Sequence, residues 1–592
     1  MPCLGARNVN YAQLGPITDS YRPTKQSAKR HYGSHPYFTK RAWNVVQEYI
    51  KHFTQPNDVV LDPFGGSGVT AVESLVLRRK AIYCDISEWA CFLARQTAIA
   101  PISLAAFDRA FARVAERAKD YICSLYSLPD SRINAMRHKY WFPRNVRLPT
   151  NADVKLVEDL FTKRMLFGLS ALLHAIREDQ DEVVRDLMLV AFSATLAKVN
   201  KTFLSAQNRK ESRGGSSIFS IYRYKVAARP VELNVWEQFE LRMRRLRAAK
   251  AETNELIGHF FREPDTAQFI KGSATRLSEF VNPESVDYIY TDPPYGGHIA
   301  YLDLSRMWNA WLGFRVNDED HRNEVVVGGE NKKTEQDYAD LLKTSLCEMS
   351  KTLRLERWLS LVFAHWDPTY WRLIVETCRE AGLEYVNMVA QPVGTVWSMH
   401  KKKNPLRVIS GEWVLNFRKV GSARRRNLHK KANLGEIVRD EAEVCIVQNG
   451  GASTEMLYTA LLPRLLEAGL LDGGGQKPRD LRTLLEQLFV FVPAHQRWHL
   501  KPNVTPNPRL PIQARVRYCV ASLLHGGSRR PRRLTLSDIL EIVCIRLGNG
   551  VAVSEEMVRN CMREFAHSCD DVHWEAPANG TQLDLLMGSA GS

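Results

Sequence analysis

The sequence predicts an α/β protein whose parallel sheet is interrupted by a large helical insertion and followed by a mostly helical C-terminal region. Three observations favour this class. An apolar run at 59–61, typical of a buried parallel strand, leads through a glycine-rich loop into a helical pattern. Helical periodicity then dominates from about 88 to 265. Strand patterns return at 267–272 and 286–291, so the sheet must be built from two separate parts of the chain.

The first strand region follows a polar, basic arm over residues 1–38. The arm leads into a predicted helix over 39–53, and a turn at Pro56-Asn57-Asp58 separates this helix from the strand at 59–61. Residues 69–80 are helical in character, and 81–86 form the second predicted strand.

The insertion and the second strand region follow in order. Apolar residues recur with a spacing near 3.6 in FDRAFARVAERAKDYI and VEDLFTKRMLFGLSALLHAI, and a basic, glycine-containing loop at 209–217 interrupts this pattern. Beyond 286–291, a strand over 359–366 precedes a helix over 369–383. The last predicted strands, 388–394 and 412–420, form a pair.

The C-terminal region begins after the basic linker 421–431. Two stretches in it are alike: DLRTLLEQLFVFVPAHQRWHL, and the segment from TLSDILEIVCIRLGNG to VHWEAP, each run from a helix towards a strand that contains tryptophan. This similarity suggests two small winged-helix-like units.

Composition limits the classes of function. The chain has 592 residues and a formal net charge of +16, which favours a polyanionic partner, nucleic acid first and a membrane surface second. The eleven cysteines include no C-x-x-C pair, which argues against a zinc ribbon and a disulfide framework. Cysteines without a disulfide pattern fit a reducing cytoplasm, where we expect the protein to act. The N-terminus lacks a secretory pattern and no apolar run could span a membrane, so we expect no membrane partner.

The glycine loop in VVLDPFGGSGVTAVES, 59–74, predicts a cofactor site. Gly65, Gly66 and Gly68 let the backbone approach a ligand closely, and Asp85 lies at the end of the next strand, where it can accept hydrogen bonds from ribose hydroxyls. The loop is not G-x-x-x-x-G-K-[ST], so it is a poor triphosphate cradle. A cofactor with ribose and adenine but no pyrophosphate fits better than NAD.

The tetrapeptide Asp292-Pro293-Pro294-Tyr295 follows the predicted strand 286–291, at the sheet edge where ligands bind in open α/β folds. The Asp292 carboxylate and the Pro293 carbonyl can each accept one N–H of an exocyclic amino group. Holding both favours a pyramidal nitrogen, whose lone pair can attack an electrophilic methyl group. Tyr295 offers a stacking face for a base.

The two motifs together resemble those of the DNA amino-methyltransferases, which use S-adenosylmethionine to make N6-methyladenine or N4-methylcytosine. DPFGGSG at 62–68 resembles the cofactor motif of this family, and DPPY at 292–295 its catalytic motif. SHPYFTKRAW at 34–43 occupies the place of the family's N-terminal cofactor motif, and 404–420 resembles its closing strand hairpin. The resemblance implies a Rossmann-like methyltransferase core.

A further segment, KGSATRL at 271–277, resembles the strand end that touches the cofactor adenine in this family. Ser273 stands where an Asp is more usual. Aromatic faces at Phe64 and Phe38 can favour a sulfonium charge, and Tyr301 is a second candidate platform for a base.

The resemblance implies a catalytic set and a cofactor set, with no metal ligand. The candidate catalytic residues are Asp292, Pro293, Pro294 and Tyr295. The candidate cofactor residues are Asp62, Pro63, Phe64, Gly65, Gly66, Ser67, Gly68, Asp85, Ser273 and Phe38.

Four regions follow from these patterns. Residues 1–100 hold the arm and the first part of the methyltransferase core, and 101–264 form the helical insertion, a candidate for target recognition. Residues 265–420 hold the second part of the core, and 421–592 form a helical domain for DNA or partner binding.

The function expected from the resemblance is site-specific methylation of adenine N6 in double-stranded DNA, in restriction-modification or phage defence, with a cognate endonuclease or defence proteins as possible partners. The target base must leave the duplex stack to reach the cleft. Alternatives are N4-cytosine methylation, RNA adenine methylation and a non-catalytic DNA-binding module. Asp292 and Tyr295 argue against the last of these.

Other features have structural or phosphate-binding interpretations. Trp308 and Trp311 are expected in a core. The basic stretches 401–403, 423–431 and 529–533 are candidates for contact with a nucleic-acid backbone.

Overall fold

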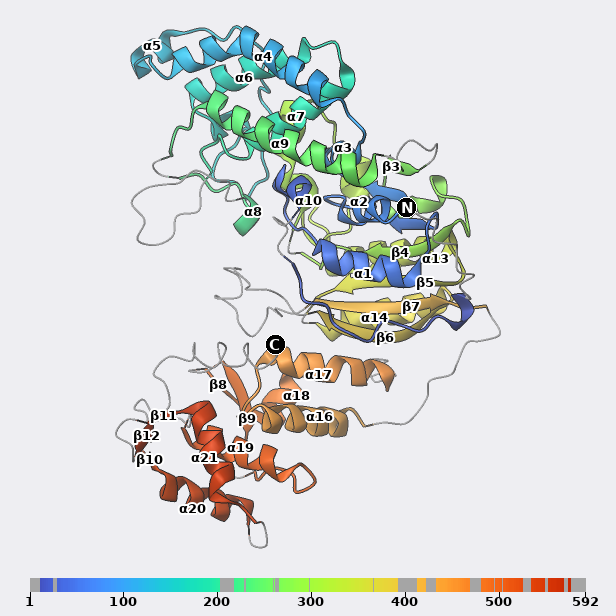
Figure 1. Ribbon diagram of the computed structural model, residues 1–592, viewed down its shortest axis with the longest axis vertical. Coiled ribbons are helices and arrows are strands. Elements are labelled where there is room, and N and C mark those ends of the chain that lie inside the picture. The colour runs from blue at the N-terminus through green and yellow to red at the C-terminus, as the bar shows by residue number, and fades with distance from the viewer. Residues whose placement is uncertain are drawn as a thin grey trace. The chain divides into compact units, whose positions relative to one another are not determined.

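In the computed structural model the chain forms two compact units (Figure 1). The first comprises Met1–Ala364, Leu373–Met399 and Glu412–Arg425, and the second comprises His365–Arg372, His400–Gly411 and Arg426–Ser592. The structure describes residues 11–24, 29–202, 218–227, 230–258, 260, 266–297, 299–365, 367–391, 412–421, 433–468, 481–493, 496–502, 504–524, 534–548, 552–568 and 573–575. The basic stretches at 209–217, 401–403, 423–431 and 529–533 lie outside these ranges.

A seven-stranded sheet with the order β3-β2-β1-β4-β5-β7-β6 forms the centre of the first unit. Its strands are β1 (Val59–Asp62), β2 (Lys80–Asp85), β3 (Ala267–Lys271), β4 (Val286–Thr291), β5 (Leu353–Phe363), β6 (Leu383–Gln391) and β7 (Glu412–Lys419). The first five are parallel, whereas β7 runs antiparallel to both β5 and β6. This confirms the predicted α/β class and the predicted pairing of the last two strands.

The strand order reverses between β1 and β4, because the chain leaves β1 towards β2 and β3 and returns to β4 on the other side. In open parallel sheets a ligand site forms at such a switch point, outside the carboxyl ends of the strands. The predicted glycine loop follows β1 and the predicted tetrapeptide follows β4, so the fold brings both to this point.

Helices around the sheet complete the core. They are α1 (Trp43–Phe53), α2 (Val69–Val76), α3 (Glu88–Ala98), α10 (Tyr301–Leu304), α11 (Arg306–Leu312), α12 (Asp318–Asn323), α13 (Glu335–Thr352) and α14 (Pro368–Glu380). Apolar faces of α1 and α2 share one hydrophobic cluster with strands β1, β2 and β4, centred on Val46, Tyr49 and Val72. Their fully buried side chains fix α2 against the sheet, with the glycine loop at its N-terminus.

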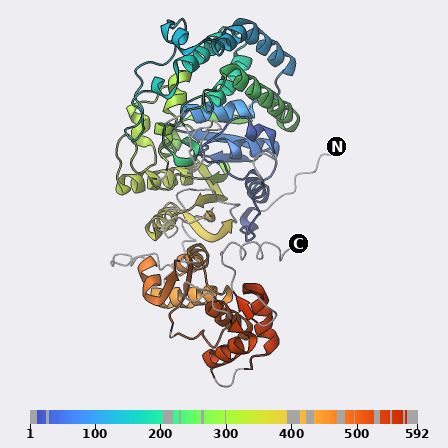
Figure 2. The ribbon, with the colours of Figure 1, turned by 90° about the vertical axis from the view of Figure 1, so that its left-hand side faces the viewer.

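The insertion is built of α4 (Leu104–Leu125), α5 (Asp130–Ala135), α6 (Lys163–Arg177), α7 (Glu182–Leu196), α8 (Ile218–Ile221) and α9 (Val235–Ile257). Side chains of Ser103, Thr162, Asp181 and Asn234 cap four of these helices at their N-termini by accepting backbone N–H bonds. The helices group beside α3 (Figures 1 and 2) and share one apolar cluster with Trp89 of α3 and Trp308 of α11. The insertion is therefore packed into the methyltransferase-like unit.

The second unit contains a structural repeat. Its first half has α16 (Leu434–Gln448), α17 (Thr454–Glu467), α18 (Leu481–Leu488), β8 (Phe489–Val492) and β9 (Arg497–Leu500). Its second half has α19 (Ile512–Leu524), β10 (Leu534–Thr535), α20 (Leu536–Leu547), α21 (Glu555–Phe565), β11 (His567–Ser568) and β12 (His573–Glu575).

The two halves share one order of elements: a helix, a short paired segment, two helices and two strands. Trp498 of β9 pairs with Ala452, and Trp574 of β12 pairs with Leu534, so the two tryptophans hold equivalent positions. This is the order of a winged helix, as the sequence suggests. The predicted register of the repeat was wrong, however, because α18 corresponds to α21 and not to the helix at 536–547.

No helix in the described part of the chain is long and apolar enough to cross a membrane. Trp308 and Trp311 are fully buried, which confirms their predicted place in a core.

Candidate active site

A cleft at the switch point receives most of the predicted site residues. Counting its open mouth, it has a volume of about 820 Å³. It is lined by Tyr37, Thr39, Arg41, Asp62, Pro63, Phe64, Gly65, Gly66, Ser67, Val69, Thr70, Asp85, Ile86, Ser273, Ala274, Tyr290, Asp292, Pro294, Tyr301, Asn323, Glu324 and Val325. Both predicted motifs therefore face one space.

The glycine loop needs its glycines. A Cβ at Gly65 would lie 2.2 Å from the Tyr83 ring, and one at Gly68 would lie 2.7 Å from Ala94 Cβ. Gly66 and Gly68 also have φ values of +49° and +79°, which favour glycine. The Gly68 N–H donates to the Gly65 carbonyl (2.8 Å) and closes the turn just before α2 begins. The loop thus places bare backbone against the cleft.

Asp85 is held at the end of β2 by backbone donors. The Gly66 N–H donates to its Oδ2 and the Ser87 N–H to its Oδ1, both at 2.8 Å. Burial raises the pKa of Asp85 to about 6, although both N–H groups oppose this shift. A carboxylate has about four acceptor positions, so these two bonds leave it acceptor capacity for hydroxyl groups of a ligand. This arrangement fits a cofactor that presents ribose hydroxyls.

Asp62 ties the two halves of the site together. Its Oδ1 accepts from Thr291 Oγ1 of β4 (2.8 Å) and from the Phe64 N–H (3.1 Å). Burial raises the pKa of Asp62 to about 6. Because one carboxylate bonds the end of β4 and the start of the glycine loop, Asp62 fixes the position of one motif relative to the other.

Asp292 has a different environment, since a guanidinium contacts it. Arg41 Nε donates to Asp292 Oδ2 at 2.5 Å, and Arg41 also pairs with Glu412 of β7. The Tyr295 hydroxyl donates to Asp292 Oδ1 and itself accepts from Arg41 Nη2 (3.0 Å). Burial raises the pKa of Asp292 to about 6 against the lowering effect of Arg41.

The rest of the tetrapeptide is held by the protein itself. Pro294 lines the cleft, and its carbonyl accepts from the Tyr338 hydroxyl (2.6 Å). The Tyr295 ring meets Phe363 edge to face, with 5.3 Å between ring centroids. The ring of Tyr301 lies on the cleft wall, where its hydroxyl contacts Thr39 Oγ1 (3.3 Å). Of the two tyrosines predicted as platforms for a base, Tyr301 lines the cleft and Tyr295 is absent from the residues that line it.

Ser273 lines the cleft beyond β3. Its Oγ accepts from the Thr275 N–H (3.2 Å) and lies 2.9 Å from Thr275 Oγ1, so it caps the short helix at Ala274–Glu279. Contact between Ser273 and an adenine stays a prediction.

The segment 29–42, which we call the strap, carries three cleft residues. Tyr37, Thr39 and Arg41 face the cleft, as alternate residues of an extended chain do. Phe38 points the other way: it is buried against Trp89, Phe219 and Trp308 and is absent from the cleft wall. Phe38, predicted to contact the cofactor, therefore lies away from the cleft, and its neighbours Tyr37 and Thr39 line the wall.

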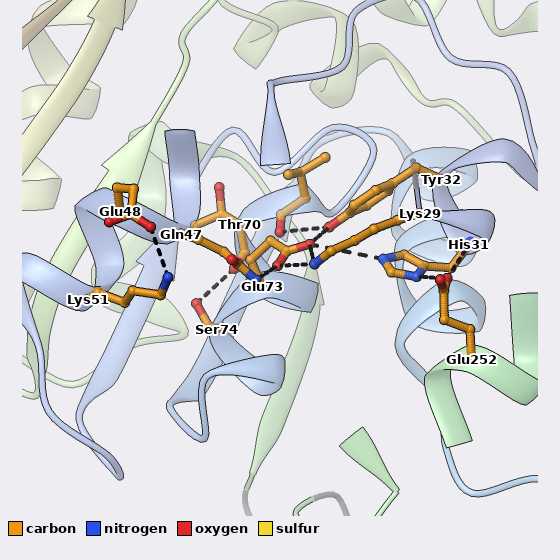
Figure 3. Close-up of polar contacts among 11 residues, drawn as sticks. Lys29, His31, Tyr32, Gln47, Glu48, Lys51, Thr70, Glu73, Ser74 and Glu252 are labelled. Atoms are coloured by element: carbon orange, nitrogen blue, oxygen red, sulfur yellow. Dashed lines mark hydrogen bonds and ion pairs between the residues drawn. The ribbon is translucent and has the colours of Figure 1, made fainter. Parts of the chain in front are cut away.

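A buried polar cluster anchors the start of the strap (Figure 3). Glu73 of α2, which is fully buried, accepts from Lys29 Nζ (2.7 Å) and from the Tyr32 hydroxyl (2.6 Å). His31 Nδ1 lies 2.6 Å from Glu252 of α9. The strap is thus attached to the helix that follows the glycine loop and to the insertion.

The sequence did not single out Arg41 and Glu412. Arg41 lay inside the stretch matched to the family's N-terminal motif, and Glu412 inside the predicted last strand. They are 371 residues apart, so their pairing has no local signal. The one available hint was that a buried catalytic carboxylate requires a compensating charge.

A family profile described as DNA methylase, N6_N4_Mtase, matches residues 7–96, which span the strap, the glycine loop and β2. The type II methyltransferase M.MjaII of Methanocaldococcus jannaschii is 20% identical over 434 residues, covering 62% of this chain and 78% of the relative. The putative methylase YubD of Escherichia coli is 42% identical over 64 residues, covering 11% of this chain and 26% of the relative.

Among solved structures, TTHA0409 of Thermus thermophilus, titled a putative DNA modification methylase, aligns with a TM-score of 0.15 at 18% identity. The alignment covers 29% of this chain and 60% of that one. The family match and the two relatives, taken with the cleft, support a DNA methyltransferase.

Proposed function

We propose that this protein transfers a methyl group from S-adenosylmethionine to the N6 amino group of adenine in double-stranded DNA. One observation carries the proposal: the Asp292 carboxylate and the glycine loop face the same cleft at the β1/β4 switch point. A methyl donor held by the loop would therefore lie beside the group that receives the amine. The choice of adenine rests on the DPPY pattern at 292–295.

The cofactor half of the proposal rests on the glycine loop, Asp85 and Ser273. Backbone at 65–67 lines the cleft and Asp85 has acceptor capacity for ribose hydroxyls, which suits a nucleoside without a pyrophosphate. Bound S-adenosylmethionine would supply an electrophilic methyl group. The aromatic rings of Phe64 and Tyr37 on the cleft wall favour the sulfonium charge.

The catalytic half rests on positioning. An amino N–H donated to the Asp292 carboxylate turns the nitrogen lone pair towards the methyl carbon. Bound S-adenosylmethionine would supply the methyl group and leave as a neutral thioether, and Asp292 or water would take the proton that the methylated nitrogen loses. In duplex DNA the target amine lies inside the base stack, so the base must turn out into the cleft, where Tyr301 offers a stacking surface.

The biological setting belongs to the same proposal. The similarity to a type II methyltransferase supports a role in restriction-modification or phage defence, with a cognate endonuclease or defence proteins as partners.

Nucleoside mass spectrometry tests the proposal directly. The purified full chain is incubated, in separate reactions, with unmethylated duplex DNA and with RNA, both of mixed sequence, and with S-adenosylmethionine that carries a deuterated methyl group. Each polymer is then digested to nucleosides. We expect labelled N6-methyldeoxyadenosine. Labelled N4-methyldeoxycytidine would reassign the base, label found in RNA alone would reassign the polymer, and no label in either would remove the enzymatic function. Single-molecule sequencing of the same DNA then gives the sequence context.

A further inference from the structure

Arg41 is placed in the cleft by a well-anchored piece of chain. Lys40 Nζ donates to the carbonyls of Tyr32 and His35, both at 2.6 Å, and closes the strap immediately before Arg41. Helix α1 begins two residues later at Trp43 and packs on β4 through Tyr49 and Tyr290. With the Glu73 cluster at the other end of the strap (Figure 3), the backbone of Arg41 is held on both sides.

The guanidinium of Arg41 lies where an incoming amino group must donate. Its Nε donates to Asp292 Oδ2 (2.5 Å), while Nη1 bonds Glu412. Glu412 is more exposed than Asp292, with 39% of its side chain accessible against 18%. The guanidinium can therefore keep its contact with Glu412 when a substrate N–H replaces it on Asp292.

We propose that Arg41 is a positioning residue for methyl transfer: it holds the Asp292 side chain as an oriented carboxylate and occupies the place of the target amine until a base enters. Arg41 acts through Asp292, so the inference rests on the proposed function for its catalytic meaning. Its physical part, the charge coupling of Arg41 and Asp292, is independent of that function.

The electrostatic surroundings of Asp292 give the coupling its sign. Burial and the Glu412 charge oppose ionisation of Asp292, whereas Arg41 and the Tyr295 hydroxyl favour it. Tyr290 on β4 and Tyr301 on α10 also face this group. Without Arg41, burial and Glu412 act with less opposition, so the pKa of Asp292 rises above its value of about 6.

The first test measures thermal unfolding of the cofactor-free protein from pH 6 to pH 8 for wild type, Arg41→Gln, Asp292→Asn and the double variant. Wild-type Asp292 is half ionised at pH 6 and almost fully ionised by about pH 7, so its effect on stability levels off there. In Arg41→Gln the titration of Asp292 extends to higher pH and goes on lowering the stability of the protein. We expect the Tm gap between wild type and Arg41→Gln to widen with pH. In the Asp292→Asn background the effect of Arg41→Gln must be independent of pH.

The second test uses activity. A cation within about 6 Å lowers a carboxyl pKa by roughly one to three units. We therefore expect Arg41→Gln to move the acid limb of the kcat/KM profile upward by about one unit or more, and to lose about threefold or more activity near pH 6.5. Much of that loss should be recovered at pH 8.5. Arg41→Lys, which keeps the positive charge and is the safer variant for folding, should restore most of the wild-type profile.

The matched control is Arg357→Gln. Arg357 pairs with Asp287 (2.9 Å) at the opposite end of the same strand, β4, and its side chain is as buried as that of Arg41. Arg357→Gln should lower stability and leave the acid limb where it is. An Arg41→Gln variant with an unmoved acid limb and a Tm gap constant with pH would overturn the inference. If wild type methylates nothing but the Tm coupling is present, the proposed function fails and the coupling stands.

Discussion

The two ends of the cleft solve one physical problem in different ways. Asp85 at the proposed cofactor end and Asp292 at the proposed catalytic end are both partly buried carboxyls, and desolvation raises the pKa of each to about 6. Asp85 is stabilised by two neutral backbone N–H groups, whereas Asp292 is stabilised by the charged guanidinium of Arg41. Neutral donors and a cation both offset the desolvation of a carboxylate, but they differ in how they leave its acceptor positions open to a ligand.

This difference matches what each end is proposed to bind. Backbone donors are fixed in place and leave acceptor positions on Asp85 that a ribose hydroxyl can share. A side-chain cation can move, so the acceptor that it covers on Asp292 becomes available when a substrate amine arrives. One end is thus suited to holding a resident cofactor, and the other to exchanging a substrate.

The largest expected effect is on the rate of methyl transfer, when Asp292 loses its charge. Asp292→Asn keeps the size of the side chain but replaces the anionic acceptor with a neutral amide. Loss of one positioned electrostatic group typically lowers kcat by about 10²–10³-fold. Single-turnover methylation of DNA should show this loss, while the Kd for S-adenosylmethionine, measured by calorimetry, should stay within about twofold because Asp85 and the loop are unchanged.

The kinetic result for Asp292→Asn requires a control for folding. Asp292→Asn removes the ion-pair partner of Arg41, so circular dichroism and thermal unfolding must show a folded protein before the kinetics are compared. A variant that is folded and methylates at the wild-type rate would mean that Asp292 is not the amine acceptor.

The sheet and the two motifs could be predicted from the sequence because each rests on contiguous residues. The predicted strand at 286–291 coincides with β4, and the loop at 62–68 follows β1. The side of the strap that faces the cleft could not be predicted, because alternation in an irregular segment depends on packing against α3 and α11. Phe38 was placed on the wrong side for this reason.

Long-range charge pairing was equally invisible. The contact of Arg41 with Asp292 joins residues 251 positions apart, and no local pattern marks either as a partner of the other. The C-terminal repeat shows the intermediate case. Its two tryptophan-containing strands could be matched by their composition. The sequence comparison paired α18 with α20, because their apolar spacing is similar, whereas the structural equivalent of α18 is α21.

The next largest expected effect is on the affinity for S-adenosylmethionine, when Asp85 loses its charge. In Asp85→Asn the amide presents an N–H group towards one of two backbone donors, so the Gly66 or Ser87 bond is lost and the side chain becomes a weaker acceptor. Hydrogen bonds to a charged group contribute about 1.5–3 kcal/mol, so the Kd for S-adenosylmethionine should rise about 10- to 100-fold.

The rate of methyl transfer at saturating cofactor should change far less in this variant. Asp108→Asn is the control, because Asp108 is an exposed carboxylate on α4 that pairs with Arg247 and lies outside the cleft wall. An Asp85→Asn variant with wild-type cofactor affinity and a reduced rate would reverse the roles assigned to the two ends.

The smallest expected effect is the pH dependence that Asp85 gives to cofactor affinity and to protein stability. If cofactor hydroxyls bind the ionised form of Asp85, affinity for S-adenosylmethionine should be constant above pH 7 and fall as pH decreases through about 6, approaching about tenfold per unit. Stability of the cofactor-free protein has the opposite sign. The folded-state pKa of Asp85 exceeds the ordinary value of 3.8, so its titration removes stability as pH rises from about 4 to 6.

The comparison of wild type with Asp85→Asn separates these two signs, since asparagine does not titrate. On acidification from pH 6 to pH 4, wild type should gain stability relative to Asp85→Asn in urea unfolding. The gain should be at most about 3 kcal/mol, because burial raises the pKa of Asp85 from 3.8 to about 6. Over the same range wild type should lose its advantage in cofactor affinity. If affinity and stability instead changed in the same direction with pH, the cofactor would not require the ionised form of Asp85.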